Sequence, residues 1–183
     1  FQNTFGPARL LQSYTMMIVI ALYLGFFLAV KFVPKFYDKL PHDRGREFTE
    51  HAAEAKGKPT GAGIVFITIF VFISILCVPL TALQSIIVAL TWVSMLTGYL
   101  DDKSAKGWGE YLKAFLDLII CLLASFAMYY YLKQVEVEPK VYFWLPFYTH
   151  VIEVPCWLYV IVGTVILWTS INTTNCTDGV DGL

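Results

Sequence analysis

The sequence predicts an all-α integral membrane protein, with residues 1–183 forming a single polytopic membrane domain. Of its residues, 57% are hydrophobic and only 15% are charged, whereas soluble domains contain about 45 to 50% apolar residues. Five apolar runs also approach the roughly 20 residues with which a helix crosses the hydrocarbon core of a bilayer. We therefore expect five transmembrane helices, at about residues 14–30, 61–79, 81–96, 114–131 and 154–171.

The segments between these runs differ in character. Residues 31–60 form a long polar loop, Pro79 begins a tight turn, and residues 97–113 form a short charged loop. Residues 135–154 alternate in polarity and contain Val, Tyr, Phe and Trp, a pattern typical of short strands with aromatic side chains at headgroup level. This pattern predicts a short external β-hairpin.

The distribution of Lys and Arg predicts the orientation of the helices. Loop 31–60 carries seven of these residues and loop 97–113 carries three, against three in the rest of the sequence. Because basic loops tend to stay in the cytoplasm, the N-terminus is expected outside, and both loops and the polar run 172–181 are expected inside. Three polar clusters distant in sequence would then converge on one face of the membrane.

Asp101 and Asp102 follow the third apolar run directly. Two adjacent carboxylates at a membrane boundary repel each other and need a cation or hydrogen-bond donors. A divalent metal ion would meet this need. The alternative is a solvated cap that keeps the end of the segment out of the lipid.

A second polar cluster follows the fifth apolar run without a break. Asn172, Asn175, Asp178 and Asp181 recur every three residues, which keeps them on one side of a helix or tight turn. Gly179 and Gly182 permit sharp turning and close approach of the backbone to a ligand. An ordinary helix stop has a similar composition. An EF-hand is excluded by the spacing of the acidic residues.

A third cluster, Gly-Lys-Pro-Thr-Gly-Ala-Gly at residues 57–63, leads into the second apolar run. Lys58 provides an ammonium group and Thr60 a hydroxyl at the start of a helix, where free amides favour anions. This combination suits phosphate, although the spacing is not that of a P-loop. The alternative for Lys58 is a snorkelling anchor at the membrane surface.

Lys113 and Asp117 are four residues apart at the start of the fourth run. An ionisable residue so close to lipid indicates a functional site, and the alternative is a salt bridge that holds the helix end. The four cysteines lie far apart without CxxC spacing. We interpret them as small core-like residues rather than metal ligands or disulfide partners.

In this order, the motifs at residues 57–60, 98–102 and 172–183 resemble those of the polyprenyl-phosphate N-acetylhexosamine-1-phosphate transferases. The resemblance is strongest to members that act on UDP-MurNAc-pentapeptide. It implies transfer of phospho-MurNAc-pentapeptide from the UDP carrier to undecaprenyl phosphate, with release of UMP and formation of lipid I for peptidoglycan synthesis. It also implies a requirement for Mg²⁺ and an active site on the cytoplasmic face of the bacterial inner membrane.

The resemblance also implies roles for individual residues. Asp101 and Asp102 would be the catalytic carboxylates and the metal ligands, while the division of roles between them stays open, as does the choice between direct displacement and a phosphoryl-aspartate intermediate. The substrate-binding residues would be Lys58, Thr60, Lys113, Asn172, Asn175, Asp178, Gly179 and Asp181.

The sequence departs from the family in two respects. Gly61-Ala62-Gly63 stands where Met-Gly-Gly is common. Family members also have about ten spans of the kind that crosses a bilayer. We therefore expect this chain to be the N-terminal half of such a bundle, incomplete at its C-terminus and inactive by itself.

Three other functions compete with this interpretation. A related transferase would use UDP-GlcNAc in place of the peptide-bearing donor. A secondary transporter would place its polar residues near the membrane midplane, whereas the clusters here gather at one interface; a structural membrane subunit would leave them unexplained. No nucleic-acid partner is expected. Homodimers are common in the family, although no motif in this sequence specifies one.

Overall fold

The computed structural model describes residues 10, 13–42, 57, 59–104, 107–135, 141–143, 150 and 152–177. Its helices and strands belong to two compact units. The first unit contains residues 1–81 and 95–107, and the second contains residues 82–94 and 108–183. Each unit is described by itself.

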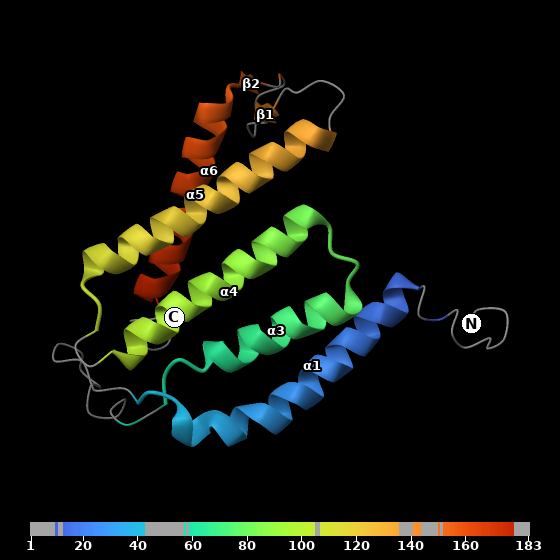
Figure 1. Cartoon of the computed structure of the whole chain (residues 1–183), viewed down its shortest axis with the longest axis vertical. Coiled ribbons are helices and arrows are strands. Elements are labelled where there is room, and N and C mark those ends of the chain that lie inside the picture. The colour runs from blue at the N-terminus through green and yellow to red at the C-terminus, as the bar shows by residue number, and fades with distance from the viewer. Residues whose placement is uncertain are drawn as a thin grey trace. The chain divides into compact units, whose positions relative to one another are not determined.

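The first unit is built on two helices that lie side by side, α1 (Tyr14–Phe36) and α3 (Gly63–Cys77) (Figure 1). A short 3-10 helix, η2 (Tyr37–Lys39), extends α1. Gly25 brings the two helices close, since a Cβ atom on it would lie 3.2 Å from Cδ1 of Ile73.

One face of α1 carries exposed apolar side chains at every fourth residue. Ile18, Leu22, Phe26 and Val30 are all more than half exposed, and a spacing of four places them on one side of the helix. A contiguous apolar stripe of this kind suits hydrocarbon rather than water.

The second unit contains residues 82–94 of α4 (Ala82–Lys103), then α5 (Glu110–Val135), β1 (Val141–Phe143), β2 (Ile152–Val154) and α6 (Cys156–Thr177). The two strands pair antiparallel, with Val141 opposite Val154 and Tyr142 opposite Glu153. This confirms the predicted hairpin. It connects α5 with α6, which pack against each other (Figure 1).

Small residues bring α5 and α6 into close contact. Cys121 and Ser125, one turn apart on α5, are each 1% exposed. A Cβ atom on Gly163 of α6 would lie 3.0 Å from Oγ of Ser125 and 3.4 Å from its Cβ. Small residues allow this approach of helix backbones within a membrane. In the part of the chain that the structure describes, the Ser125 hydroxyl has no hydrogen-bond partner.

Replacing Gly163 with Ala is expected to destabilise the protein, by about 1 to 3 kcal/mol as for other overpacked sites. The added methyl group would press on Ser125, whereas a Cβ on the helical Gly98 would meet nothing within 4 Å. Thermal unfolding of the detergent-solubilised protein should therefore show a lower Tm for Gly163→Ala but not for Gly98→Ala. Adding Ser125→Ala should restore part of the loss, because it removes the nearest atom; additive effects in this double-mutant cycle would contradict the contact.

Among the residues that the structure describes, four helices are long and apolar enough to cross a membrane, and they correspond to the first, third, fourth and fifth predicted spans. The protein is therefore a multi-pass membrane protein. The second predicted span, residues 61–79, is wrong in length, because α3 has 15 residues and a length of about 22 Å. Helix α3 ends before Pro79, because helical geometry is disfavoured for the residue that precedes a proline. That residue, Val78, is accordingly extended, with φ −115° and ψ 129°.

The predicted charged loop at 97–113 is also too long. Helix α4 continues to Lys103 and α5 begins at Glu110, so that only residues 104–109 separate the two helices. A helix satisfies its own backbone hydrogen bonds and does not need hydrocarbon to continue. For the same reason α6 continues beyond the expected end at 171 and includes Asn172.

Candidate functional site

The carboxylate pair lies on the last turn of α4, in the first unit. Consecutive residues on a helix are about 100° apart, so Asp101 and Asp102 are directed to different sides. Oδ1 of Asp101 lies 3.8 Å from the position that a Cβ on Gly107 would occupy. Oδ2 of Asp102 lies 3.5 Å from the corresponding position on Gly61. The two carboxylates therefore have different neighbours.

The segment that precedes α3 is held in place by Pro41. The backbone N–H of Thr60 donates to the carbonyl oxygen of Pro41 at 2.7 Å, and its hydroxyl donates to the same oxygen at 3.2 Å. A β-bridge between His42 and Pro59 adds a second link. Because its proton is used in this way, the Thr60 hydroxyl supports the loop, and its role toward a substrate stays a prediction.

Gly61 is the point where two of the predicted clusters meet. Its φ of +70° is a conformation that favours glycine. A Cβ atom there would lie 3.2 Å from Cδ2 of Tyr99 and 3.4 Å from Cγ of Pro41, in addition to its approach to Asp102. The structure thus brings the 57–63 motif against the end of the 98–102 motif, while the side of the membrane on which they meet stays a prediction.

Two lysines contact aromatic rings in the same unit. Nζ of Lys103 lies 5.9 Å from the ring centre of Tyr99, and Nζ of Lys39 lies 5.7 Å from that of Phe36. An ammonium group at these distances is attracted to the face of a ring. Positive charge therefore accompanies the carboxylate pair at this end of the unit.

In the second unit, Lys113 and Asn172 lie at the same end of the α5–α6 pair. Nε1 of Trp168 donates to the carbonyl oxygen of Ala114 at 2.8 Å, which ties α6 to the first turns of α5. Asn172, one turn beyond Trp168, donates through Nδ2 to the Trp168 carbonyl oxygen at 2.8 Å. Its amide oxygen can still accept a hydrogen bond. Whether this end of the unit adjoins the carboxylate pair stays a prediction.

Asp117 is 3% exposed. It lies one turn before Cys121 on α5, on the side that carries the buried residues of the α5–α6 contact. Charged side chains are almost never this buried unless they are paired, and Asp117 does interact with a neighbouring group.

Several predicted site residues lie outside the described part of the chain. These are Lys58, Asp178, Gly179, Asp181 and the side chain of Asn175. Their predicted contacts with a nucleotide-sugar therefore stay predictions.

The described residues fit a magnesium ion in one specific way. No group of three or more His, Cys, Asp or Glu that could hold a metal occurs among them, so a cage made only of protein ligands is not formed by this part of the chain. Magnesium is usually bound by one or two carboxylates together with substrate phosphates and water. Asp101 and Asp102 provide such carboxylates, and the missing side chains of Gly61 and Gly107 leave space beside their oxygens.

Sequence reasoning missed the residues that position this site. Pro41 and Tyr99 lie on different segments from Gly61, and nothing in their local sequence indicates the contact. Lys39 is one of the seven basic residues of loop 31–60, and no local feature of the sequence distinguishes it from the others. Trp168 lies within an apolar run, and a tryptophan whose ring is partly buried usually donates its N–H to a partner. This tendency is the signal that could have indicated its hydrogen bond.

Comparison with known proteins gives consistent matches. The model of the family described as glycosyl transferase family 4 matches residues 83–183. A phospho-N-acetylmuramoyl-pentapeptide-transferase of Treponema pallidum (strain Nichols) is 47% identical over 98% of this chain and 48% of the relative. Proteins of the same name from Kosmotoga olearia and Aquifex aeolicus are 30% and 29% identical, over 90% and 96% of this chain and 54% and 51% of their own lengths. The chain thus spans about half the length of these curated relatives, and no solved structure matches it.

Proposed function

Because the chain belongs to glycosyl transferase family 4, we propose that the whole protein transfers phospho-MurNAc-pentapeptide from its UDP carrier to undecaprenyl phosphate. The products are UMP and lipid I, the first lipid-linked intermediate of peptidoglycan synthesis. The observation that carries this proposal is the 47% identity, over 98% of the chain, to a transferase named for this group. The close approach of Asp102 to Gly61, where the 57–63 and 98–102 motifs meet, supports a catalytic site at this point of the first unit.

The reaction is a displacement at phosphorus. An oxygen of the acceptor phosphate attacks the sugar-linked phosphorus of the diphosphate, and the bond to the UMP oxygen breaks. The second pKa of a phosphate monoester is about 6, so at neutral pH the acceptor is largely dianionic and needs little help from a base. The main barrier is the repulsion between two anions.

The residues of this chain would act mainly by position and charge. Asp101 and Asp102 would hold Mg²⁺ or orient the acceptor phosphate, and Lys103 would add positive charge beside them. Bound magnesium would supply charge neutralisation for the diphosphate and the leaving UMP. Lys58, Lys113, Asn172, Asn175, Asp178, Gly179 and Asp181 would bind the nucleotide-sugar.

The proposed orientation places this site in the cytoplasm of a bacterial cell, at the inner membrane. That position admits a water-soluble nucleotide from one side and a lipid phosphate from the inner leaflet. Ten Lys and Arg residues in the two polar loops, against three elsewhere, support it.

The direct test is UMP release by the full-length protein in detergent or nanodiscs. We expect release that depends on both UDP-MurNAc-pentapeptide and undecaprenyl phosphate, stops when EDTA removes divalent metal, and returns with added Mg²⁺. Undecaprenol, which lacks the phosphate, serves as the matched inactive acceptor. Release with UDP-GlcNAc but not with UDP-MurNAc-pentapeptide would replace the proposal with the related GlcNAc-1-phosphate transfer, and release unaffected by EDTA would remove the metal from it.

A further inference from the structure

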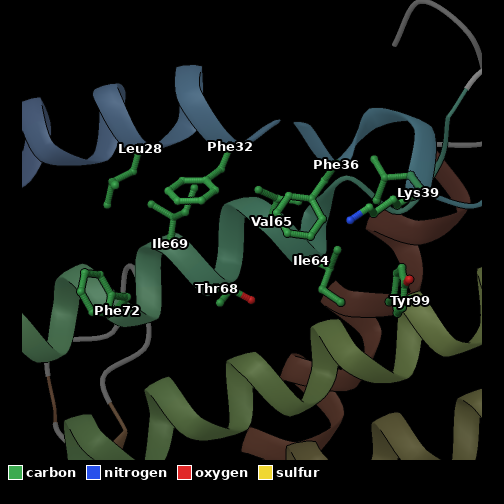
Figure 2. A pocket seen from close by; sticks show the side chains of 11 residues that line it. Leu28, Phe32, Phe36, Lys39, Ile64, Val65, Thr68, Ile69, Phe72 and Tyr99 are labelled. Atoms are coloured by element: carbon green, nitrogen blue, oxygen red, sulfur yellow. The ribbon is translucent and has the colours of Figure 1, made fainter. Parts of the chain in front are cut away.

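A cavity of about 750 Å³ lies between α1 and α3, and we call it the α1–α3 groove (Figure 2). Its lining is almost entirely apolar and includes Leu28, Phe32, Ile69 and Phe72. The volume is within the range of about 300 to 1,000 Å³ that is typical of ligand sites. It is therefore large enough to bind part of an apolar chain.

The groove has one apolar end and one polar end. Leu28 and Phe72 lie at the apolar end, and Lys39 and Tyr99 lie at the other (Figure 2). From Leu28 to Phe36 the axis of α1 advances by about 12 Å. The amphiphile that suits this groove has an apolar chain and a head group at the end marked by Lys39.

The charge at the polar end favours an anionic head group. The ammonium group of Lys39 lies over Phe36, which lines the groove, and that of Lys103 lies over Tyr99, which also lines it. Two cations therefore flank one end of an apolar groove. A phosphate monoester would complement both charges.

The same end adjoins one of the two carboxylates, that of Asp102. Cδ2 of Tyr99 and Oδ2 of Asp102 both lie within 3.5 Å of a single point, the position of a Cβ on Gly61. A phosphate at the polar end of the groove is thereby brought next to Asp102. A lipid whose phosphate reacts must reach the carboxylate, so it needs a groove whose polar end adjoins Asp102. A phospholipid of the surrounding membrane has no such requirement.

We propose that the α1–α3 groove binds the first isoprene units of the polyprenyl phosphate acceptor and presents its phosphate at the Lys39–Tyr99 end. This assignment rests on the proposed function, since it places the lipid substrate of that reaction. The remainder of the lipid chain would continue into the bilayer, for which the exposed apolar stripe of α1 is suited.

Photocrosslinking tests the location. The probe is undecaprenyl phosphate with a diazirine in an isoprene unit near the phosphate, added to the full-length protein in phosphatidylcholine nanodiscs. We expect mass spectrometry to find the label on residues 28–40 and 64–72, and unlabelled undecaprenyl phosphate to compete. Labelling only elsewhere, as when another part of the protein covers the groove, would overturn the assignment. Equal competition by phosphatidylglycerol would also overturn it, in favour of a general anionic-lipid site.

Two pairs of variants test the contribution to turnover. Ile69→Trp fills the groove, while Phe70→Trp changes the next residue of α3, which is exposed and does not line it. Lys39→Gln removes the charge at the polar end, while Lys35→Gln removes a charge in the last turn of α1 away from the lining. We expect Ile69→Trp and Lys39→Gln to raise the KM for undecaprenyl phosphate about tenfold, which corresponds to about 1.4 kcal/mol, with kcat and the KM for the UDP-sugar within twofold. The two control variants should match wild type.

The readouts separate this assignment from the proposed function. If the protein labels at the groove but releases no UMP, the proposed function fails and the lipid site stands. If it turns over normally, labels elsewhere and tolerates Lys39→Gln, the groove assignment fails alone. Should Ile69→Trp not fold, the Lys39→Gln variant and the crosslinks still decide between these results.

Discussion

Replacing Asp102 with Asn is expected to lower kcat for UMP release by about 10²- to 10³-fold, the range seen when one charged or polar stabilising group is removed from an active site. The amide keeps the shape of the side chain and removes its negative charge, so the fold should be unchanged. The carboxylate concerned lies 3.5 Å from the Cβ position of Gly61, where two sequence motifs meet. Steady-state kinetics of the full-length protein would measure the effect.

The matched control is Asp38→Asn, which removes an exposed carboxylate from η2 in the same unit. It should leave kcat unchanged. Activity of Asp102→Asn within threefold of wild type would exclude Asp102 from the reaction.

Titration with Mg²⁺ would then distinguish the roles of the two carboxylates. If Asp102 binds the metal, high Mg²⁺ should restore part of the activity of Asp102→Asn, because weakened affinity is overcome by concentration. If it positions the acceptor instead, added Mg²⁺ should have no effect. The Asp101 carboxylate is directed to Gly107 instead. Added Mg²⁺ should therefore have no effect on Asp101→Asn if Asp102 binds the metal, and should restore part of its activity if Asp102 positions the acceptor.

The same two variants bear on the reaction route. A phosphoryl-aspartate intermediate would leave a phosphorylated protein in acid-quenched wild type incubated with the donor, and the modified residue would be lost in one of the Asn variants. We favour direct displacement, which predicts no such species in any of the three proteins. Its detection on Asp101 or Asp102 would establish the two-step route.

Replacing Gly61 with Ala is expected to cost both stability and activity. A residue with a side chain at φ +70° is strained by about 1 to 2 kcal/mol, and the added Cβ would lie 3.2 Å from the Tyr99 ring. The Tyr99 ring or the loop around Gly61 must then move. Oδ2 of Asp102 lies 3.5 Å from the same Cβ position, so this movement should also displace the Asp102 carboxylate and lower activity. Thermal unfolding would measure the first effect and kcat the second.

Two other glycines separate strain from contact. Gly57 has φ +88°, and a Cβ on it would meet nothing within 4 Å, so Gly57→Ala adds strain alone. Gly63 has neither a positive φ nor a nearby atom, so Gly63→Ala should lower neither stability nor activity. If Gly61→Ala lost no more activity than Gly57→Ala, the close approach to Tyr99 and Asp102 would have no part in the site.

Hydropathy located the helices well but not their ends. The pattern stops where hydrocarbon stops, whereas backbone hydrogen bonds continue along α4 to Lys103 and along α6 to Thr177. Asp101 and Asp102 therefore lie on a helix, which directs them to different sides, and not in the loop that their polarity suggests. Helix α3 shows the opposite deviation, because Pro79 ends it although the apolar residues continue.

By itself, the sequence determined that the chain is a multi-pass membrane protein with a hairpin between its fourth and fifth apolar runs, and that Asp101 and Asp102 are the residues to test first. These properties depend on composition and on short-range order, which are readable along the chain. Only the tertiary structure decided that Asp102, Tyr99 and Pro41 meet at Gly61, and that the same end opens into an apolar groove with Lys39 at its mouth. Such contacts join residues far apart in sequence, and they are set by loop closure and by packing between α1 and α3, which leave no periodic signal in the sequence.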